Sequence, residues 1–345
     1  MKLSEFRYTV PKNLVANYPA DPRDSSKLMV LDRETGEAEN KVFGDIVSYF
    51  RKGDCLVLNN TRVFPARLHG KKEKTNANIE VMLLRELKAE DKIWDVIVDP
   101  ARKVRIGNKI YFDDYKFYCE IIDNTTSRGR TVRFNYEDDI YKIIERIGQM
   151  PLPEYIKREP SELDKDTYQT VYAQETGSIA APSAGLHFTK NIIKKLQKKG
   201  VRIAYVTLHI GYGAFQPVDV EDLTKHKMHS EYFEIPKESV ELINRTLKAK
   251  GNVFACGASV TRALESSVLT SGTVKQNKGW TDKFVYPPYE FKIVSRLITG
   301  FHPPKSTLML LSAAFAGKDT LIDAYKQAAK EEYRFFAYGD ALMIK

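Results

Sequence analysis

The stretch TKNIIKKLQKKGVRIAYVTLHIG, residues 189–211, decides the fold of this chain. Its first half places Ile192, Ile193 and Leu196 on one face of a predicted helix, with Thr189 as the N-cap. Its second half is an apolar run of the kind that forms a buried strand. A helix that leads directly into a buried strand is typical of α/β proteins.

The same alternation continues on both sides of this stretch. The further predicted elements are a strand with a tight turn at 27–40, a helix at 43–54, strands at 55–60 and 252–257, and helices at 238–251 and 260–269. Alternating helices and strands imply a mixed or mostly parallel sheet that is covered by helices.

The middle of the chain follows a different pattern. Short strands separated by turn residues, with no helix between them, are predicted at 78–87, 92–100, 104–112, 116–122 and 130–136. Such a run indicates a small antiparallel barrel or sandwich. We therefore predict an α/β domain with a mixed sheet and covering helices, formed by residues 1–65 and 151–345. An inserted antiparallel β-barrel domain at residues 66–150 interrupts it.

The composition is that of a globular chain with a basic surplus. Of 345 residues, 43% are hydrophobic, and 54 lysines and arginines face 45 aspartates and glutamates, a formal charge of +9. This surplus favours a polyanionic partner such as RNA. Three cysteines without a C-x-x-C pair disfavour a disulfide framework. No secretory signal is visible and the apolar run at 306–317 is too short to span a membrane, so we expect the cytoplasm and no membrane partner.

Histidines gather in the second half of the chain, which holds five of the six: His187, His209, His226, His229 and His302. Imidazole is the usual proton carrier near neutral pH, so together they indicate a shared cleft. Each of them alone is equally compatible with a core or surface position.

The stretch GSIAAPSAGLHFT, residues 177–189, carries no charged side chain and leaves two interpretations open. Its small residues fill a tight buried turn with His187 as a satisfied core histidine, or they let a ligand approach the backbone with His187 directed at it. Ser183 is no serine-hydrolase nucleophile, because the first glycine of the nucleophile elbow is missing.

Two other motifs permit chemistry without defining it. HKMHSE at 226–231 contains metal-ligand residue types, but its spacing matches no standard zinc helix, and no metal is expected. Ser259 or Thr261 is expected to N-cap a helix whose first amide groups can hold an anion. Neither G-x-G-x-x-G nor a P-loop is present, which disfavours ordinary dinucleotide and triphosphate sites.

A series of longer motifs resembles the S-adenosylmethionine:tRNA ribosyltransferase-isomerase family of queuosine biosynthesis. They lie in order at 18–36, 58–70, 151–158, 168–189, 206–218, 226–231, 261–266, 301–317 and 333–344, which is nearly the whole chain. The resemblance implies a larger α/β domain interrupted by a small β-barrel.

The resemblance also implies an activity. The ribosyl group of S-adenosylmethionine would pass, with isomerisation, to the aminomethyl group of 7-aminomethyl-7-deazaguanine at the wobble position of tRNA. The product would be epoxyqueuosine in tRNA, and adenine and methionine would leave. S-adenosylmethionine would be a co-substrate, with no metal or separate redox cofactor, and we expect a monomer.

The implied chemistry needs a base that removes a proton from the sugar carbon beside the sulfonium, for which His187 and His229 are our candidates. Asp340 is a candidate proton donor to the departing adenine, and Glu231 and Arg262 are expected to hold the charged groups of methionine. The other expected contacts to S-adenosylmethionine are Ser178, Ala180, Gly185, His209, Gly211, Gly257 and Ser259. Those to tRNA are Arg62, His302, Lys305 and Arg334.

The chain departs from the family pattern at several of these motifs. GASVTR at 257–262 moves or loses two hydroxyl groups, Gln216 stands where arginine is usual, Gly300 replaces an amide side chain, and Pro288 replaces glycine. Glutamine cannot replace a positive charge, so any contact that the usual arginine makes to a phosphate or carboxylate is expected to be lost here. A divergent enzyme acting on another RNA with the same co-substrate, and a non-catalytic RNA-binding protein, stay open as alternatives.

Overall fold

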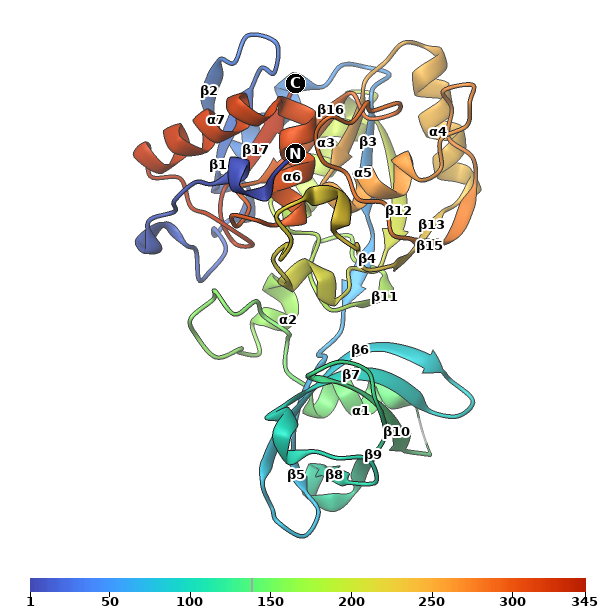
Figure 1. Ribbon diagram of the computed structural model, residues 1–345. Helices are drawn as coiled ribbons and strands as arrows, with labels where there is room; N and C mark the ends of the chain where they lie inside the picture. The colour runs from blue at the N-terminus through green and yellow to red at the C-terminus, as the bar shows by residue number, and fades with distance from the viewer. Residues whose placement is uncertain (138) are drawn as a thin grey trace.

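The chain is described from a computed structural model, which covers residues 1–137 and 139–345. Figure 1 shows two parts, a larger one that contains both termini and a smaller barrel below it. This arrangement confirms the predicted fold class, an α/β domain interrupted by an antiparallel barrel.

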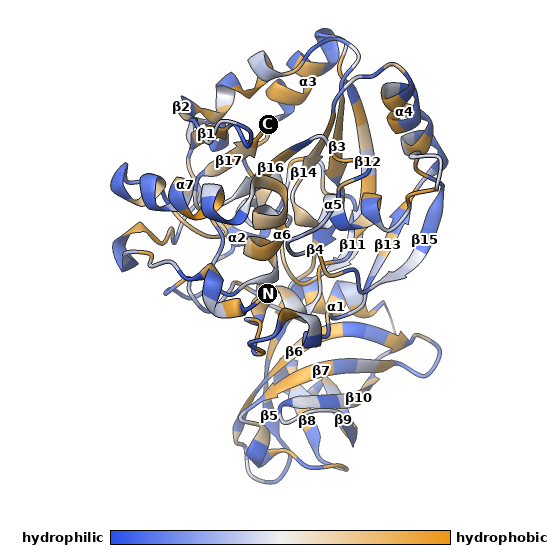
Figure 2. Ribbon diagram, turned by 45° about the horizontal axis from the view of Figure 1, so that its top comes forward, coloured by the Kyte–Doolittle hydropathy of each residue, from blue (hydrophilic) through white to orange (hydrophobic). Residues whose placement is uncertain are grey.

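The larger part is built on a nine-stranded mixed sheet. The strand order is β15 (Asn277–Thr281), β13 (Glu231–Ile235), β12 (Arg202–Leu208), β3 (Cys55–Asn59), β14 (Val253–Cys256), β16 (Arg296–Gly300), β17 (Ala341–Ile344), β1 (Lys27–Leu31) and β2 (Ala38–Val42). The central strands β12, β3, β14 and β16 run parallel to one another, and the outer strands on both sides include antiparallel pairs. These central strands are largely hydrophobic, as Figure 2 shows.

Helices cover both faces of this sheet, so its central strands are buried on both sides. On one face Val57 and Val206 pack with side chains of α4, α5, α6 and α7. On the other face Leu56 and Leu58 pack with those of α3 and the 3₁₀ helix η4 (Phe43–Tyr49). The helix bounds are α2 (Asp164–Thr167), α3 (Lys190–Lys198), α4 (Lys237–Lys248), α5 (Ala258–Glu265), α6 (Thr307–Ala316) and α7 (Lys318–Lys330).

The smaller part is a closed antiparallel barrel of six strands. They are β5 (Arg67–Lys72), β6 (Asn78–Lys88), β7 (Ile93–Asp99), β8 (Lys109–Phe112), β9 (Phe117–Asn124) and β10 (Gly129–Asn135), followed by α1 (Ile140–Ile147). Ile140 and Ile144 of α1 pack into the barrel core. These elements lie within the predicted segment 66–150, whose limits as a domain stay a prediction.

A short parallel ladder lies where the chain leaves for the barrel. There β4 (Thr61–Val63) pairs with β11 (Glu175–Ser178), so the route into the barrel is fixed to the start of the small-residue stretch 177–189.

Local predictions were confirmed at α3 and wrong at two other places. The Thr189 hydroxyl accepts a hydrogen bond from Ile192 N at 3.2 Å, as expected for the N-cap of α3. The predicted helix at 43–54 is only a 3₁₀ helix, η4 (Phe43–Tyr49). Neither Ser259 nor Thr261 caps α5. Both lie inside the helix, because Gly257, with a φ of +91°, makes the sharp turn from β14.

Candidate active site

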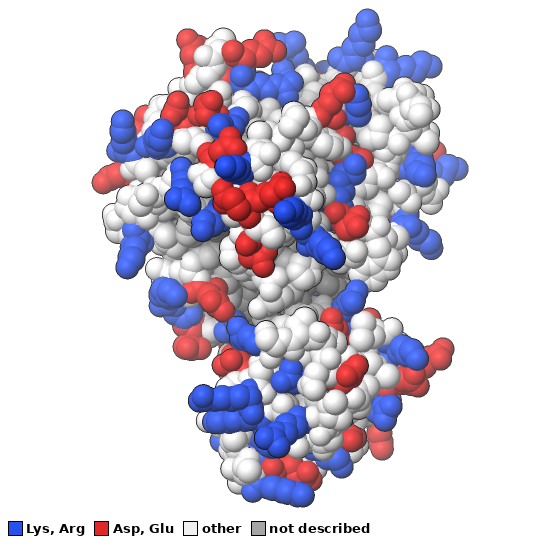
Figure 3. Space-filling model, viewed as in Figure 1, with Lys and Arg blue, Asp and Glu red and all other residues white. Residues whose placement is uncertain are grey.

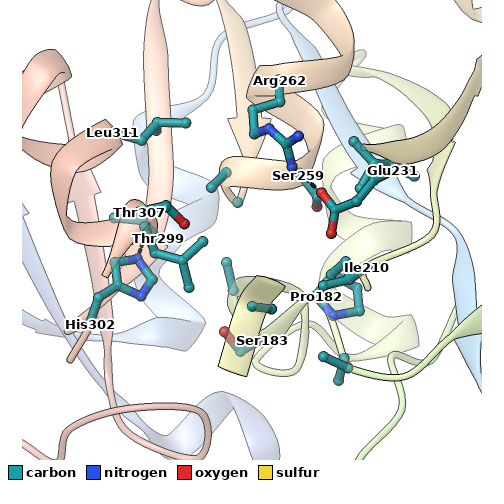
Figure 4. A pocket seen from close by; sticks show the side chains of 18 of the residues that line it. Pro182, Ser183, Ile210, Glu231, Ser259, Arg262, Thr299, His302, Thr307 and Leu311 are labelled. Carbon is teal, nitrogen blue, oxygen red and sulfur yellow. Dashed lines mark hydrogen bonds and ion pairs between the residues drawn. The ribbon is translucent and has the colours of Figure 1, made fainter. Parts of the chain in front are cut away.

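A pocket lies at the carboxyl ends of the parallel strands β12, β3, β14 and β16, where open α/β sheets usually bind ligands. We call it the central pocket. Its lining includes Ala180, Ala181, Pro182, Ser183 and Ala184 of the small-residue stretch, Gly257, Ala258, Ser259 and Arg262 at the start of α5, and Thr307, Leu308 and Leu311 of α6. Figure 4 shows side chains from these segments converging on one space.

Glu231 and Arg262 form a buried ion pair at one side of the central pocket (Figure 4). Arg262 Nη1 donates to Glu231 Oε2, and the other carboxylate oxygen accepts from Gly211 N at 2.7 Å. Arg262 Nε also donates to Lys283 O at 2.8 Å. The Arg262 side chain is 8% exposed and the Glu231 side chain 5% exposed. Two opposite charges therefore lie side by side, largely shielded from water, in a mostly apolar lining. Glu231 and Arg262, both expected to hold the charged groups of methionine, thus lie together at the pocket, and their role in binding stays a prediction.

The beginning of α5 supplies a second polar feature. Gly257 turns the chain at the end of β14, and Gly257, Ala258 and Ser259 line the pocket. The unpaired amide groups and the dipole of a helix start favour a negatively charged group at this position. Ser259 Oγ is itself held by Asn59 Nδ2 at 3.0 Å, which fixes it to the end of β3.

His302 faces the central pocket from the opposite side (Figure 4). Its Nε2 lies 2.7 Å from Thr299 Oγ1, and among the described residues its Nδ1 has no hydrogen-bond partner. Burial lowers the pKa of His302 to about 4, so the ring is neutral at pH 7. When Nε2 donates to Thr299, Nδ1 carries a free lone pair.

Two glycines of the small-residue stretch pack closely against the side chains of Tyr172 and His209. A Cβ at Gly185 would lie 2.1 Å from Tyr172 OH, and a Cβ at Gly177 would lie 2.7 Å from His209 Nε2. Between these glycines, residues 180–184 form a wall of the central pocket. The stretch is therefore both tightly packed and pocket-lining.

His187 lies outside that wall. Its Nδ1 is 2.8 Å from Ser26 Oγ, and its ring packs on Phe43 with centroids 5.0 Å apart. Burial, with the charges of Arg334 and Arg23, lowers the pKa of His187 to about 3. This is the environment of a hydrogen-bonded core histidine, and its catalytic role stays a prediction.

Asp340 and Arg334 are bound to each other. Asp340 is 2% exposed, and its Oδ1 lies 3.1 Å from Arg334 Nη2, while its Oδ2 accepts from Arg334 N at 2.8 Å. Neither residue lines the central pocket. The predicted roles in proton donation and tRNA binding are untested by this geometry, which provides a structural partner for each.

Ser178 and His209 belong to one hydrogen-bonded group outside the lining of the central pocket. Thr61 Oγ1 is 2.7 Å from Ser178 Oγ and 2.8 Å from His209 Nδ1, and Ser178 Oγ accepts from Ile210 N at 2.7 Å. Burial lowers the pKa of His209.

A second cleft lies beside the central pocket, towards the barrel. His209 and Gly211 line it together with His229, Tyr232 and Glu231, and Glu231 lines both spaces. His229 is exposed there, and its Nε2 is 3.0 Å from Gln216 Oε1. Gln216 is thus a partner of a predicted catalytic residue.

Arg62 and Lys305 are not part of the central pocket. Arg62 is half-buried on β4, and Lys305 is exposed in the turn before α6. His302 lies on the lining of the central pocket, and its expected contact with tRNA stays a prediction.

Sequence reasoning missed several pocket residues. Among them are Tyr155, Tyr168, Thr299 and Leu311. A signal was available, because each lies in or beside one of the motifs that carry the family resemblance. The predicted contacts were limited to charged residues, histidines and small residues of those motifs, so larger hydrophobic and aromatic side chains were omitted.

Within residues 1–137 and 139–345, no group of three or more His, Cys, Asp or Glu side chains is placed to hold a metal ion. In the same part of the chain, no helix has the length and apolar character needed to cross a membrane.

Comparison with known proteins gives consistent results. The chain matches the protein family described as "Queuosine biosynthesis protein" over residues 3–344. It is 56% identical over 346 residues to a protein of Chloroherpeton thalassium and 55% identical over 347 residues to one of Cytophaga hutchinsonii, covering 100% of each chain. Both are named S-adenosylmethionine:tRNA ribosyltransferase-isomerase.

A solved structure is similar as well. The crystal structure of S-adenosylmethionine tRNA ribosyltransferase from Thermotoga maritima is 35% identical, with a TM-score of 0.55, over 99% of this chain and 100% of that chain.

Proposed function

Because the chain belongs to the queuosine biosynthesis family of S-adenosylmethionine:tRNA ribosyltransferase-isomerases, we propose that it transfers and isomerises the ribosyl group of S-adenosylmethionine onto tRNA. The acceptor is the aminomethyl group of 7-aminomethyl-7-deazaguanine at the wobble position, and the product is epoxyqueuosine in tRNA. Adenine and methionine leave. The transfer involves no net oxidation, so the proposal includes no metal or redox cofactor, and it places a monomeric enzyme in the cytoplasm.

The buried Glu231–Arg262 pair is the observation that carries this proposal. The methionine part of S-adenosylmethionine has an ammonium and a carboxylate group on one carbon. A carboxylate and a guanidinium side by side in an apolar lining complement such a zwitterion. The start of α5 adds attraction for the carboxylate.

The apolar part of the central pocket suits the nucleoside. Ile210, Phe215, Leu308 and Leu311 line it, and the backbone of residues 180–184 is accessible because the side chains there are small. Such a lining excludes water from the carbanion that forms beside the sulfonium.

His302 is our candidate for the base that removes the proton from the sugar carbon. Among the described residues, His302 is the one histidine that lines the central pocket. Its ring is neutral at pH 7, and its Nδ1 has no hydrogen-bond partner in the described chain. His187 and His229 remain alternative candidates for the base.

Adenine release tests the proposal. The protein is incubated with S-adenosylmethionine and tRNA that carries the deazaguanine precursor, and free adenine is measured by chromatography. Adenine release that requires this tRNA supports the proposal. Release with a tRNA that carries unmodified guanine points to another acceptor, and RNA binding without release points to a non-catalytic protein.

A further inference from the structure

A cleft between the two domains leads to the central pocket. It is lined by Lys12 and Val15, by Arg67 and Arg128 of the barrel, and by parts of segments 152–157 and 303–306. We call it the interdomain cleft. Pro153, Tyr155, Ala214 and Phe215 line both this cleft and the central pocket, so the two spaces adjoin. Figure 3 shows the molecule hollowed between its two parts, with Lys and Arg side chains near the hollow.

The free charges of the interdomain cleft are mainly positive. Its two arginines have carboxylate partners, since Arg67 Nε lies 3.6 Å from Glu80 and Arg128 lies 3.6 Å from Asp99. Lys12 and Lys157 are exposed and have no carboxylate within 4.0 Å among the described residues. Lys305 is also exposed and lies between the cleft residues Pro304 and Ser306. Among the described residues of the lining, Glu154 is the carboxylate that has no basic side chain within 4.0 Å.

An exposed aromatic ring belongs to Tyr18, whose chain neighbour Asn17 contacts the cleft residue Lys157. Tyr18 is 64% exposed, and Arg158 Cζ lies 4.3 Å from the centre of its ring. Asp164 fixes Arg158 through two hydrogen bonds of 2.7 Å, so the guanidinium is a rigid backing for one face of the ring. Lys157 N donates to Asn17 Oδ1 at 2.9 Å, which keeps this platform beside the lysine of the cleft.

We propose that the interdomain cleft binds the single-stranded anticodon loop of the RNA substrate, with Lys12 and Lys157 on its phosphates and Tyr18 stacked on one of its bases. Lysines beside an aromatic platform are the usual combination for single-stranded nucleic acid. The adjoining central pocket then receives the base that reacts. This inference rests on the proposed function and adds to it the surface that holds the RNA.

The experiment measures the affinity of a fluorescent anticodon stem-loop at several salt concentrations. The double variant K12E/K157E is expected to bind at least 10-fold more weakly, with a salt slope reduced by about 1.4, because each phosphate contact contributes about 0.7 for a single strand. Y18A is expected to bind about 10-fold more weakly with an unchanged salt slope, because it loses stacking and no charge. Affinity for S-adenosylmethionine, measured by calorimetry, is expected to stay unchanged in all of them.

The matched control is K194E/K198E on α3, where both lysines are exposed and outside the cleft and the pocket. It changes the net charge by the same amount. If K12E/K157E weakens RNA binding no more than this control, the cleft proposal is wrong. If that result comes with normal adenine release by the wild type, the proposed function still stands. If the wild type neither binds the stem-loop nor releases adenine, both proposals fall.

Discussion

At the residue scale, two buried side-chain groups face each other across the central pocket. The Glu231–Arg262 pair offers both charges, and His302 on the other side offers a neutral nitrogen. Each is held by partners of its own, Gly211 and Lys283 for the pair and Thr299 for the ring. Such fixed groups serve a substrate without first having to be ordered.

Substitution of His302 tests its role as the base. We expect H302A to lower kcat for adenine release about 100-fold or more, because general-base catalysis contributes on the order of 10²–10⁴. H187N is the matched variant, since His187 is equally buried but packs on Phe43 outside the pocket lining. It should retain kcat within a few-fold. If H187N lost activity and H302A kept it, His187 would be the base and His302 would not.

The ion pair makes a separate prediction for substrate binding. E231Q should weaken binding of S-adenosylmethionine about 30-fold, because loss of one charge of a buried pair costs about 2 kcal/mol or more. E234Q, on the same strand β13 and facing away from the pocket lining, is the control. Calorimetric titration measures both. Equal affinities of E231Q and E234Q for S-adenosylmethionine would show that the ion pair does not contribute to binding.

Burial of the two histidines also links stability to pH. The folded pKa values of His302 and His187 are about 4 and about 3, whereas an unfolded histidine titrates near 6.5. The unfolded state therefore binds more protons as the pH falls below 6.5, and the stabilisation present above that pH is lost towards pH 4. Each of the two histidines should lower the free energy of unfolding by about 2 kcal/mol when the pH falls from 7 to 5.

Urea unfolding at both pH values should show a smaller loss of unfolding free energy for H187N than for the wild type. Equal losses would contradict this account.

At the element scale, α5 positions the pocket through both of its ends. All eight of its residues are buried, its start lines the pocket, and Glu265 at its end accepts hydrogen bonds from the backbone of Lys292, Ile293 and Val294. This anchors the segment that follows the pocket residues 283–285. The helix thus ties the pocket wall to the sheet.

Removal of this anchor should be costly. We expect E265A to lower the free energy of unfolding by about 2–3 kcal/mol, because it leaves several buried amide groups without acceptors. E265Q keeps an acceptor oxygen and should lose less. Chemical denaturation gives the energies, and hydrogen exchange of residues 292–294 shows whether the segment loosens. Unchanged exchange in E265A would show that the anchor is dispensable.

At the scale of the whole molecule, the sequence predicted what local patterns control. Thr189 and the apolar face of α3 defined a helix, and short strands defined the barrel. The site was harder to predict than the fold, because residues far away in the sequence determine where a side chain points. Ser26, 161 residues away in sequence, holds His187 in the core, and no local pattern reveals this bond. His302 reaches the pocket because β16 ends beside β14, which only the sheet order determines.

The two domains divide the proposed work between them. The α/β domain supplies the central pocket, and the barrel supplies one side of the cleft that leads to it. In the proposed complex, an RNA strand between the domains would bring one base to the pocket while the rest of the substrate stays outside. A large RNA and a small co-substrate can therefore meet at one place.

The most direct test of ribosyl transfer follows two labels of S-adenosylmethionine. The co-substrate carries ¹⁴C in its ribose and ³H in its methyl group, and tRNA with the deazaguanine precursor is recovered after the reaction. The account predicts that ¹⁴C enters the tRNA while ³H leaves with methionine. Recovery of ³H in the tRNA, or of neither label, would contradict it.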